Sequence, residues 1–355
     1  MSRRSTALLK TALAAVHYTG AGNLLAPYTR GAGVIFMLHQ VDPHPPMEFE
    51  PNRILRVTPQ FLDEVVREVI EAGFDVIPLD GVRERLQDPD PARPFACFTL
   101  DDGYRDNRDY AYPVFRRHKV PFTIYVPTDF ADGKGDFWWL TFEKVLRAAP
   151  QITLAMRGET RHFRLSTAAE KQIAHHEIYW WLREIPERQA RALVAELASD
   201  HGIRPERAHA DLIMSWDELR DLADDPLVTI GGHTRRHFAL GKLDETEVRD
   251  EMAESILRIE AELGRPCRHF SYPFGCARSA GEREFRIAEE LGIETAVTTQ
   301  KGLLYPEHIN ELTGLPRLSL NGDFQDVRYV KALLSGVPFA LMNTLKRYSG
   351  GRLSI

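Results

Sequence analysis

Cysteine is scarce in this chain of 355 residues, which contains only Cys97, Cys267 and Cys276. Their number is odd and no Cys-x-x-Cys pair exists, so the sequence suggests neither a disulfide framework nor a structural zinc site built from cysteines. Hydrophobic residues make up 43% of the chain. A chain of this length and composition can bury a sizeable core and does not need covalent cross-links to fold.

The chain also lacks an excess of charge of one sign. Its 51 acidic and 45 basic residues are mixed along the sequence and leave a formal net charge of −6. Because proteins that bind nucleic acid need a concentrated basic surface, we expect no nucleic-acid partner. After the N-terminal region, no segment supplies the roughly 20 consecutive apolar residues that a membrane-spanning helix requires.

The N-terminal region has two interpretations. Basic residues precede an apolar stretch at residues 6–16, as in a signal peptide, but Lys10 interrupts the stretch and no Ala-x-Ala-like cleavage site follows. The stretch also has the period of an amphipathic helix, with an apolar face made of Leu8, Leu9, Ala12, Leu13 and Val16. We favour the second interpretation, an uncleaved arm over residues 1–32 that makes peripheral contact with a membrane. The expected location is cytoplasmic or peripheral to a membrane.

From about Gly33 onward, short apolar segments alternate with segments of helical period. The pattern predicts strands at 34–38, 95–100, 122–126, 227–230, 269–272, 295–298 and 316–320. It predicts helices over 61–70, 216–222, 245–263 and 282–291. This alternation is typical of a parallel sheet covered by helices, so we expect an α/β fold, either a barrel or a doubly wound sheet.

The alternation stops between about residues 131 and 210, where the sequence is rich in Arg, Glu and Ala and has a helical character. We therefore predict a domain over residues 33–325 that is interrupted by a helical insertion at about 131–210. A C-terminal helical tail over residues 326–355 is expected to follow.

Three groups of functional side chains come directly after predicted strands. They are Asp101-Asp102, the pair His233 and His237, and the segment Tyr272-Pro273-Phe274-Gly275. The carboxyl ends of parallel strands are where barrels place their active sites. Two histidines four residues apart, with a carboxylate from elsewhere, make a ligand set that a catalytic divalent metal commonly uses.

Asp101-Asp102 supplies more than one candidate function. Two adjacent carboxylates repel each other unless a cation holds one of them, which leaves the other free to act as a base on a water molecule. The segment from His233 to His237 lacks the glutamate of the H-E-x-x-H motif, so we assign the base to Asp101. Gly103 permits the turn that brings both carboxylates to one cavity. Each motif alone also fits a plain turn or an exposed histidine pair; together they favour amide or ester hydrolysis.

Phe98-Thr-Leu-Asp-Asp-Gly103 is similar to the T-F-D-D-G motif of the polysaccharide deacetylase family, also called the NodB homology or carbohydrate esterase 4 family. His233-Thr-Arg-Arg-His237 is similar to its H-[ST]-x-x-H motif, and the likeness spans roughly 33–321 without the insertion. The resemblance implies a distorted, incomplete (β/α) barrel of seven strands and a divalent metal, with Zn²⁺ as the first expectation. It also implies that Asp101 is the general base and that Asp102, His233 and His237 are the metal ligands.

The function implied by the resemblance is hydrolysis of N-acetyl or O-acetyl groups on a carbohydrate substrate, which is a polysaccharide, an oligosaccharide or a lipid-linked sugar. Two alternatives stay open. One is a glycan-binding protein on the same barrel with impaired catalysis, and the other is a related barrel that hydrolyses small-molecule amides.

The chain departs from the family pattern at two motifs. The family's R-x-P-[FY] motif is replaced by Ser271-Tyr-Pro-Phe-Gly275, so the arginine that orients the base is missing at Ser271. Our hypothesis is that Arg317 replaces it, although an ordinary surface arginine fits the sequence equally well. The C-terminal L-x-x-H motif is also absent, and since circularly permuted members place that histidine after the first strand, we expect His39 to be the general acid.

Further residues are assigned around this site. Phe274 and Gly275 are expected to donate backbone N–H groups to the oxyanion, and Tyr272 and Pro273 to line the substrate pocket; Gly275 also fits a plain turn.

The pairs Trp138-Trp139 and Trp180-Trp181 fit either sugar stacking or the core of the insertion, and we favour the core. Three other histidines, His44, His175 and His176, are expected at the surface.

Overall fold

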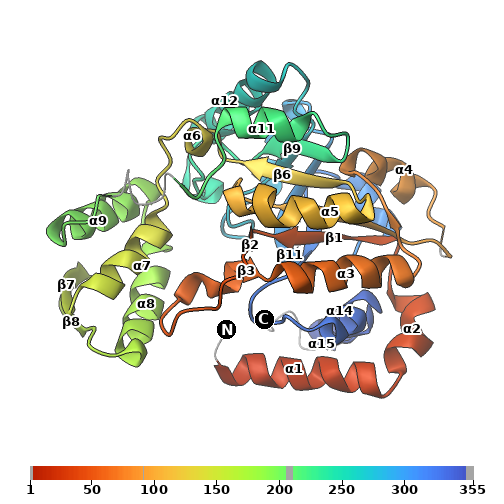
Figure 1. The fold of residues 1–355 in the computed structure, drawn as a ribbon, viewed down its shortest axis with the longest axis horizontal. Helices are drawn as coiled ribbons and strands as arrows, with labels where there is room; N and C mark the ends of the chain where they lie inside the picture. The colour runs from red at the N-terminus through yellow and green to blue at the C-terminus, as the bar shows by residue number, and fades with distance from the viewer. Residues whose placement is uncertain (1–2, 91, 205–210, 349–355) are drawn as a thin grey trace.

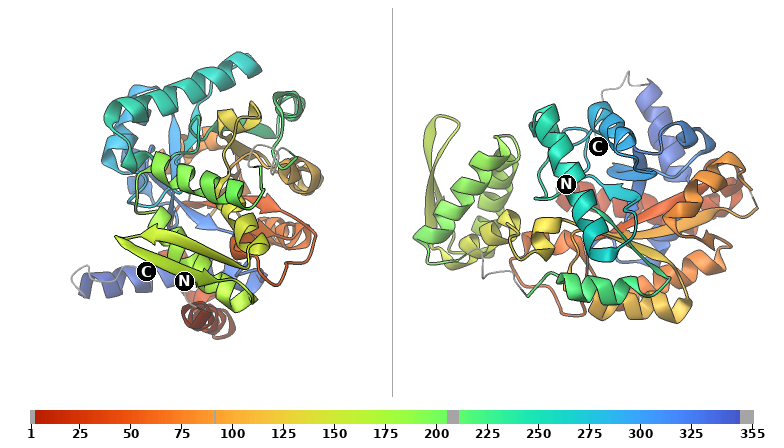
Figure 2. Two further views of the ribbon diagram at one scale, coloured as in Figure 1. Left: turned by 90° about the vertical axis from the view of Figure 1, so that its left-hand side faces the viewer. Right: turned by 90° about the horizontal axis from the view of Figure 1, so that it is seen from above.

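The computed structural model describes residues 3–90, 92–204 and 211–348. Parallel strands close into a seven-stranded barrel with helices around it (Figures 1 and 2), which confirms the expected architecture. The ring runs in the order β1 (Gly33–Leu38), β12 (Leu315–Ser319), β11 (Thr295–Lys301), β10 (His269–Ser271), β9 (Val228–Gly232), β6 (Phe122–Val126) and β5 (Phe95–Leu100). Pairing of β5 with β1 completes the ring, and the short β4 (Asp75–Val76) pairs with β5 outside it.

Three of the barrel strands, β1, β5 and β6, are largely apolar because both of their faces are covered. Every residue of β1, β5 and β6 is buried. Since successive side chains of a strand point to opposite faces, one set fills the barrel and the other packs against the helices. The interior set includes Ile35, Cys97, Tyr125, Val297 and Leu315. All seven strands were predicted from the sequence.

The outer layer consists of helices that bury one face against the barrel. They are α3 (Pro59–Glu71), α4 (Val82–Gln87), α5 (Tyr112–His118), α6 (Thr128–Ala131), α11 (Trp216–Ala223), α12 (Glu245–Leu263) and α13 (Glu282–Glu290). Helix α12 has the predicted bounds, because the Asp244 side chain accepts a hydrogen bond from the Glu247 amide at its start and Gly264, with φ of 66°, ends it. A small pair, β2 (Gln40–Val41) and β3 (Arg56–Val57), lies near the carboxyl end of β1.

The predicted insertion forms a separate lobe beside the barrel, at the left of Figure 1. It contains α7 (Trp138–Ala148), β7 (Gln151–Met156), β8 (Glu159–Arg164), α8 (Ala168–Leu182) and α9 (Glu187–Asp200), and it has a hydrophobic cluster of its own. The insertion has the predicted helical segments and also contains strands that were not predicted, since β7 and β8 pair as an antiparallel hairpin. Residues 205–210, at the expected end of the insertion, lie outside the described residues.

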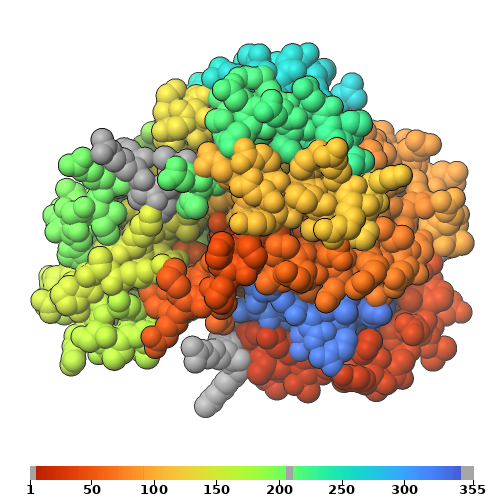
Figure 3. All heavy atoms as spheres, in the orientation of Figure 1, coloured from red at the N-terminus to blue at the C-terminus, as the bar shows by residue number. Residues whose placement is uncertain are grey.

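Both ends of the described chain form one helical layer on the side of the barrel opposite α11 and α12. This layer contains α1 (Arg3–Tyr18), α2 (Ala21–Thr29), α14 (Val327–Leu334) and α15 (Val337–Tyr348), and Figure 3 shows its red and blue segments side by side. Helix α1 contacts α14, and α2 contacts α15. The expected apolar face of α1 is divided, since Leu13 is buried against the protein while Leu8 is exposed. Among the described residues, no helix combines the length and apolar character needed to cross a bilayer; residues 1–2 and 349–355 of the expected arm and tail lie outside them.

Candidate metal and catalytic site

The site begins where β5 ends. The Asp101 amide continues the strand pairing by donating to the Leu38 carbonyl over 2.9 Å. Asp102 then has a φ of 76° and Gly103 a φ of 70°, so the chain turns sharply. In a continued strand, adjacent side chains point to opposite faces, but this turn lets both carboxylates face the same end of the barrel. Both aspartates are buried.

Asp102 lies within reach of the two histidines of the loop after β9. The Nε2 atoms of His233 and His237 are 3.4 Å and 3.2 Å from Asp102 Oδ1. One ligand atom from each of the three residues lies within 4.8 Å of the others. The Nδ1 atom of His233 is 2.6 Å from the Ser271 carbonyl oxygen. Because a carbonyl oxygen only accepts, Nδ1 carries the proton and the Nε2 lone pair faces Asp102.

The chemistry of this group fits a divalent cation. Asp102 Oδ1 is buried and has no hydrogen-bond partner within the described part of the chain. Burial lowers the pKa of His237 to about 4, so that imidazole is neutral at neutral pH. A buried carboxylate that faces imidazole lone pairs is unfavourable unless positive charge lies between them. Two imidazole nitrogens and one carboxylate oxygen are ligands that zinc takes in open catalytic sites.

Asp101 is held by Arg317 of β12. The guanidinium donates from Nη1 to Asp101 Oδ1 over 2.8 Å and from Nη2 to Oδ2 over 2.7 Å. Arg317 is only 1% exposed, so its interpretation as a surface arginine is wrong. Burial raises the pKa of Asp101, but the charge and hydrogen bonds of Arg317 outweigh that effect and hold the pKa below its ordinary value. Asp101 is therefore ionised at neutral pH.

The rest of the Arg317 guanidinium is also fixed. Its Nε donates to the Thr298 carbonyl over 2.9 Å, and Nη1 donates to Thr99 Oγ1 over 3.1 Å. Nη2 donates to Ser271 Oγ over 3.1 Å. The arginine from β12 thus reaches the residue at which the family motif has its own arginine, and the serine hydroxyl leaves room for it.

His39 follows β1 and lies beside Asp101. Its Nε2 is 3.9 Å from Asp101 Oδ2, and its side chain is partly exposed. The Asn107 side-chain amide donates to the His39 carbonyl over 2.7 Å and fixes its backbone. The two residues are neighbours because β1 and β5 pair in register, with Leu38 opposite Leu100.

The loop after β10 matches the expected pocket only in part. The expectation that Tyr272 lines the pocket is wrong, because its hydroxyl donates to the Thr313 carbonyl over 2.8 Å and its ring packs against Phe270 and Phe285. Ser271 faces the barrel interior, so the next residue points outward into the helical layer. Pro273 is buried, and Phe274, with φ of 61°, turns its ring to within 4.9 Å of the His237 ring.

Gly275 is required by its surroundings. It has a φ of 51°, and a Cβ atom added there would lie 2.5 Å from the Thr299 amide nitrogen. The Thr299 amide donates to the Gly275 carbonyl over 3.0 Å. This close approach fixes the loop that carries Phe274 against β11.

Aromatic residues of the insertion and of α6 cover the other side of His237. The Trp139 ring lies 4.9 Å from the His237 ring, and Phe130 lies 5.9 Å from it. Trp138, Trp139 and Trp181 are buried, in agreement with the core interpretation, while Trp180 is half-exposed. His44 and His176 are exposed as expected, but His175 is buried between Phe142 and Tyr179.

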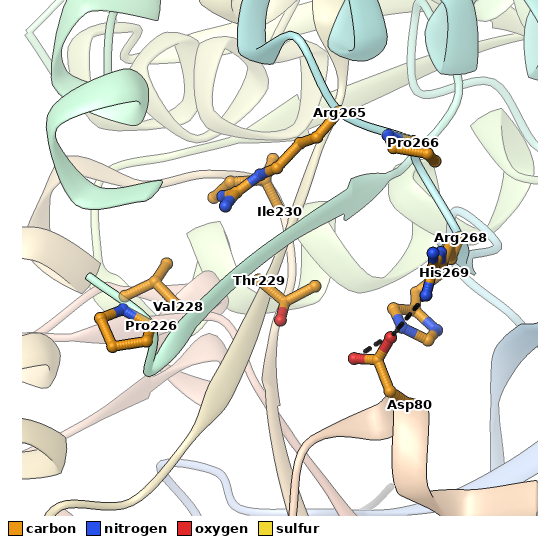
Figure 4. Close-up of a pocket in the computed structure, with 9 residues that line it drawn as sticks. All are labelled: Asp80, Pro226, Val228, Thr229, Ile230, Arg265, Pro266, Arg268 and His269. Atoms are coloured by element: carbon orange, nitrogen blue, oxygen red, sulfur yellow. Dashed lines mark hydrogen bonds and ion pairs between the residues drawn. The ribbon is translucent and has the colours of Figure 1, made fainter. Parts of the chain in front are cut away.

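A cavity of roughly 270 Å³ lies elsewhere in the barrel (Figure 4). Its walls include Thr229 and Ile230 near the start of β9 and His269 at the start of β10, so it opens at the amino end of these strands. Within it, Asp80 forms ion pairs with Arg268 and His269, each at 3.5 Å. This cavity shares no residue with the group around Asp102.

The comparisons with known proteins agree with the motifs. A family model described as polysaccharide deacetylase matches residues 88–296, which is more than half of the chain and includes Asp101, Asp102, His233 and His237. His39 and Arg317 lie outside the matched range. No curated protein sequence matches the chain.

Several solved structures have a similar fold. The Streptococcus pyogenes deacetylase PplD, in complex with acetate, is 16% identical with a TM-score of 0.54, and the match covers 82% of this chain and 92% of that one. IcaB from Ammonifex degensii is 15% identical with a TM-score of 0.54, covering 86% and 98%. BC0361, a polysaccharide deacetylase from Bacillus cereus, is 14% identical with a TM-score of 0.52, covering 85% and 68%. With the match of the family model, these findings show that the chain belongs to the polysaccharide deacetylase family.

Proposed function

We propose that this protein is a metal-dependent hydrolase that removes N-acetyl or O-acetyl groups from a polysaccharide, an oligosaccharide or a lipid-linked sugar. The observation that carries the proposal is the arrangement of Asp102, His233 and His237 as one ligand set, with a second buried carboxylate, Asp101, beside it. Asp101 is paired with Arg317, whereas His233 and His237 face Asp102, so Asp101 is available to accept a proton.

In this proposal Asp102, His233 and His237 hold a divalent metal, with Zn²⁺ as the first choice. When bound, the metal lowers the pKa of water and polarises the acyl carbonyl. Asp101 accepts the proton of the attacking water, and Arg317 keeps that carboxylate ionised and fixed in orientation. The pKa of Asp101, which is below its ordinary value, suits a base that has to be deprotonated before each turnover.

His39 has the complementary role of general acid. An amine or alkoxide leaving group is strongly basic, so it departs only when a proton reaches it as the C–N or C–O bond breaks. The His39 imidazole is the partly exposed titratable group beside Asp101, so it can meet the substrate from the solvent side. The wall of the substrate pocket is formed in this proposal by Pro273, Phe274 and Gly275. The backbone N–H groups of Phe274 and Gly275 donate to the oxyanion.

The carbohydrate substrate is inferred from family membership and from the similar structures. PplD is a deacetylase that was solved with acetate, the product that deacetylation of a sugar would release. Two other proposals make different predictions: a glycan-binding protein with impaired catalysis would keep its affinity without metal, and a small-molecule amidase would reject acetylated oligosaccharides.

Elemental analysis combined with acetate release from a panel of N- and O-acetylated oligosaccharides tests the proposal. We expect one equivalent of divalent metal and acetate release that disappears with chelator and in Asp101→Asn. Tight glycan binding that is unchanged by chelator, without acetate release in the wild type, would favour the binding protein. Turnover confined to small amides would favour the amidase.

We also propose that the catalytic domain spans residues 33–325 and that the flanking segments, 1–32 and 326–355, attach it to an anionic membrane surface. Residues 1–32 and 326–355 contain nine basic residues and one acidic residue, Asp326, whereas the rest of the chain contains 36 basic and 50 acidic residues. On α2, Leu24 is 76% and Tyr28 is 86% exposed. Exposed apolar side chains within predominantly basic segments suit peripheral binding to anionic lipid.

Vesicle sedimentation tests this attachment. The protein should pellet with vesicles that contain phosphatidylglycerol, pellet less with pure phosphatidylcholine, and be released by salt because the attraction is screened. The double change Leu24→Ser and Tyr28→Ser should weaken binding, whereas Leu257→Ser, at an exposed leucine of α12, should not. A wild type that stays in the supernatant with anionic vesicles would contradict the proposal.

A further inference from the structure

The loop that carries both metal-ligand histidines has an unfavourable backbone. Thr234 has a φ of 62° and His237 a φ of 58°, in the left-handed region that residues with a Cβ atom avoid. Such a backbone is unfavourable for residues with a Cβ atom, so the surrounding structure has to hold the loop in place. The His237 amide donates to Thr234 Oγ1 over 2.8 Å, which fixes the N-terminal side of His237.

The carbonyl side of His237 is held by the insertion. Arg191 of α9 donates from Nη2 to the His237 carbonyl over 2.9 Å and to the Arg236 carbonyl over 3.3 Å. Its Nη1 donates to the Asp136 carbonyl over 2.9 Å. Arg191 is buried, and its guanidinium also lies 4.6 Å from the centre of the Phe238 ring. A single side chain of the insertion therefore binds the backbone of a barrel loop at the metal ligand.

Glu187 fixes the position of Arg191. Its buried carboxylate lies 3.5 Å from Arg191 Nε, 3.8 Å from Arg183 Nη1 and 3.4 Å from Lys242 Nζ. Three cations around one carboxylate compensate its burial, which would be costly without them. Lys242 also donates to the Ile185 carbonyl over 2.7 Å, so the junction between α8 and α9 is tied to the barrel.

A second contact from the same junction reaches His237 through its ring. The Arg183 guanidinium lies 3.4 Å from the centre of the Phe274 ring, and Arg183 Nη2 donates to Ser279 Oγ over 3.0 Å. Phe274 in turn lies 4.9 Å from the His237 ring. The insertion thus holds the backbone of His237 through Arg191 and the ring of His237 through Phe274.

We propose that the insertion is part of the metal site, with Arg191 as a positioning residue for His237 and Glu187 as the residue that orients Arg191. This inference rests on the proposed function, because it requires that Asp102, His233 and His237 bind a metal. Arg191 touches neither metal nor substrate in this proposal. It acts by keeping the His237 imidazole oriented so that its Nε2 atom faces Asp102 and completes the set of metal ligands.

The test measures metal affinity in the intact protein and does not depend on turnover. Zinc affinity is determined by competition with a chromogenic chelator, and the visible spectrum of the cobalt-substituted protein reports the ligand geometry. We expect Arg191→Met and Glu187→Gln to weaken zinc binding by roughly 10- to 100-fold, the range typical when residues that support metal ligands are changed. The cobalt spectrum should change in Arg191→Met. Arg191→Lys should restore the affinity only in part, because one ammonium group cannot bridge the same carbonyls.

Two control variants separate positioning from general destabilisation. Arg188→Met removes an exposed arginine of the same helix, whose ion pair is with Glu247, and should leave zinc affinity unchanged. Tyr272→Phe lowers stability at a barrel residue away from the insertion and should also bind zinc normally. Thermal unfolding of the zinc-free proteins identifies any variant that fails to fold.

The outcomes distinguish the two levels of proposal. If the wild type binds no stoichiometric zinc, or if Asp102→Asn leaves binding unchanged, the proposed function fails. If the wild type binds zinc through Asp102 but the folded Arg191→Met and Glu187→Gln variants keep its affinity and its cobalt spectrum, only the role of the insertion is refuted. A loss of affinity in Arg188→Met as large as in Arg191→Met would refute it as well.

Discussion

Asp101 and Arg317 form a fully buried ion pair in which both carboxylate oxygens receive a hydrogen bond from one guanidinium. A buried pair of this kind contributes little net stability when compared with apolar residues, but breaking it by removing one partner is costly. In the proposed mechanism, the pair keeps the base Asp101 ionised inside the barrel. Thr99, Ser271 and the Thr298 carbonyl accept the remaining guanidinium hydrogens, so the arginine is satisfied as well.

Arg317→Ala should lower both stability and activity. The free energy of unfolding is expected to fall by about 3–5 kcal/mol, because Asp101 is left buried without its cation. The pKa of Asp101 should rise when the guanidinium is lost, so less of the base is ionised at a given pH. The acidic limb of kcat/KM against pH should therefore move to higher pH, and urea unfolding together with a pH–rate profile measures both effects.

Ser271→Ala is the matched control, since it removes one hydrogen bond to the same guanidinium and should cost about 1 kcal/mol with little change in the pH profile. The stabilising effect of Asp101, whose pKa is lowered in the folded protein, is present above its unfolded pKa and is lost as the pH falls through its folded pKa. Arg317→Ala should remove that dependence, and an unchanged acidic limb would contradict the role given to Arg317.

His39→Ala should reduce kcat by roughly 10²- to 10⁴-fold on an N-acetyl sugar, because the amine then leaves without a positioned proton donor. The metal content should stay at the wild-type value, since His39 is not one of the three ligands. An aryl acetate has a leaving group that needs no proton, so its hydrolysis should be much less affected. The measurement compares kcat of the wild type and of His39→Ala on both substrates. Equal losses of kcat on the two substrates would show that His39 has another role.

Among the elements, the hairpin of the insertion has a strand pattern in its sequence that was not predicted. Ile152, Leu154 and Met156 are buried while the residues between them are exposed, which is the period of a strand. Arg157 and Gly158 have φ values of 54° and 84°, as a two-residue turn between antiparallel strands requires. The flanking segments are rich in Arg and Glu and have a helical character, so the short strand alternation at residues 151–156 was not recognised.

Arg157→Asn should stabilise the hairpin. Asparagine tolerates the left-handed backbone better than arginine, and Asn-Gly is the preferred sequence of this turn, so we expect a gain of roughly 0.5–1 kcal/mol. The exposed ion pair between Arg157 and Glu184 is lost, but such pairs contribute little. Thermal unfolding compares Arg157→Asn with Arg157→Ala, which loses the same ion pair without the turn preference; equal melting temperatures would contradict this explanation.

The strands β1, β5 and β6 were predictable because they are buried on both faces and form continuous, mostly apolar runs. The shorter and more polar β10, β11 and β12 were predictable from their alternation with segments of helical period. The positions of Asp101, Asp102, His233 and His237 were predictable for a related reason, since each follows a strand. Arg191 and Glu187 were not, because the partners of Arg191 in the loop after β9 are backbone carbonyls, which no side-chain pattern marks. The i,i+4 spacing of Arg183, Glu187 and Arg191 is also common on exposed helix faces. The outward direction of Tyr272 could have been read from the alternation along β10.

At the scale of the whole molecule, metal binding should contribute to folding stability. A ligand that binds only the folded state stabilises it, by about 2.7 kcal/mol at a free concentration 100 times its Kd. Chelator should therefore lower the melting temperature of the wild type. In Asp102→Asn the melting temperature should be independent of added zinc and chelator, because a ligand is missing. An identical response of both proteins in a thermal shift assay would show that the metal acts elsewhere.

The closure of the barrel by β1 and β5 has an evolutionary consequence. A ring has no first strand, so the point at which translation begins can shift from one strand to another while every neighbour stays the same. In this chain, β1, the first strand of the ring along the sequence, pairs directly with β12, the last. The order of motifs along the sequence is therefore a poor guide to evolutionary relationship among such barrels. The cyclic order of the motifs around the ring stays the same after such a shift.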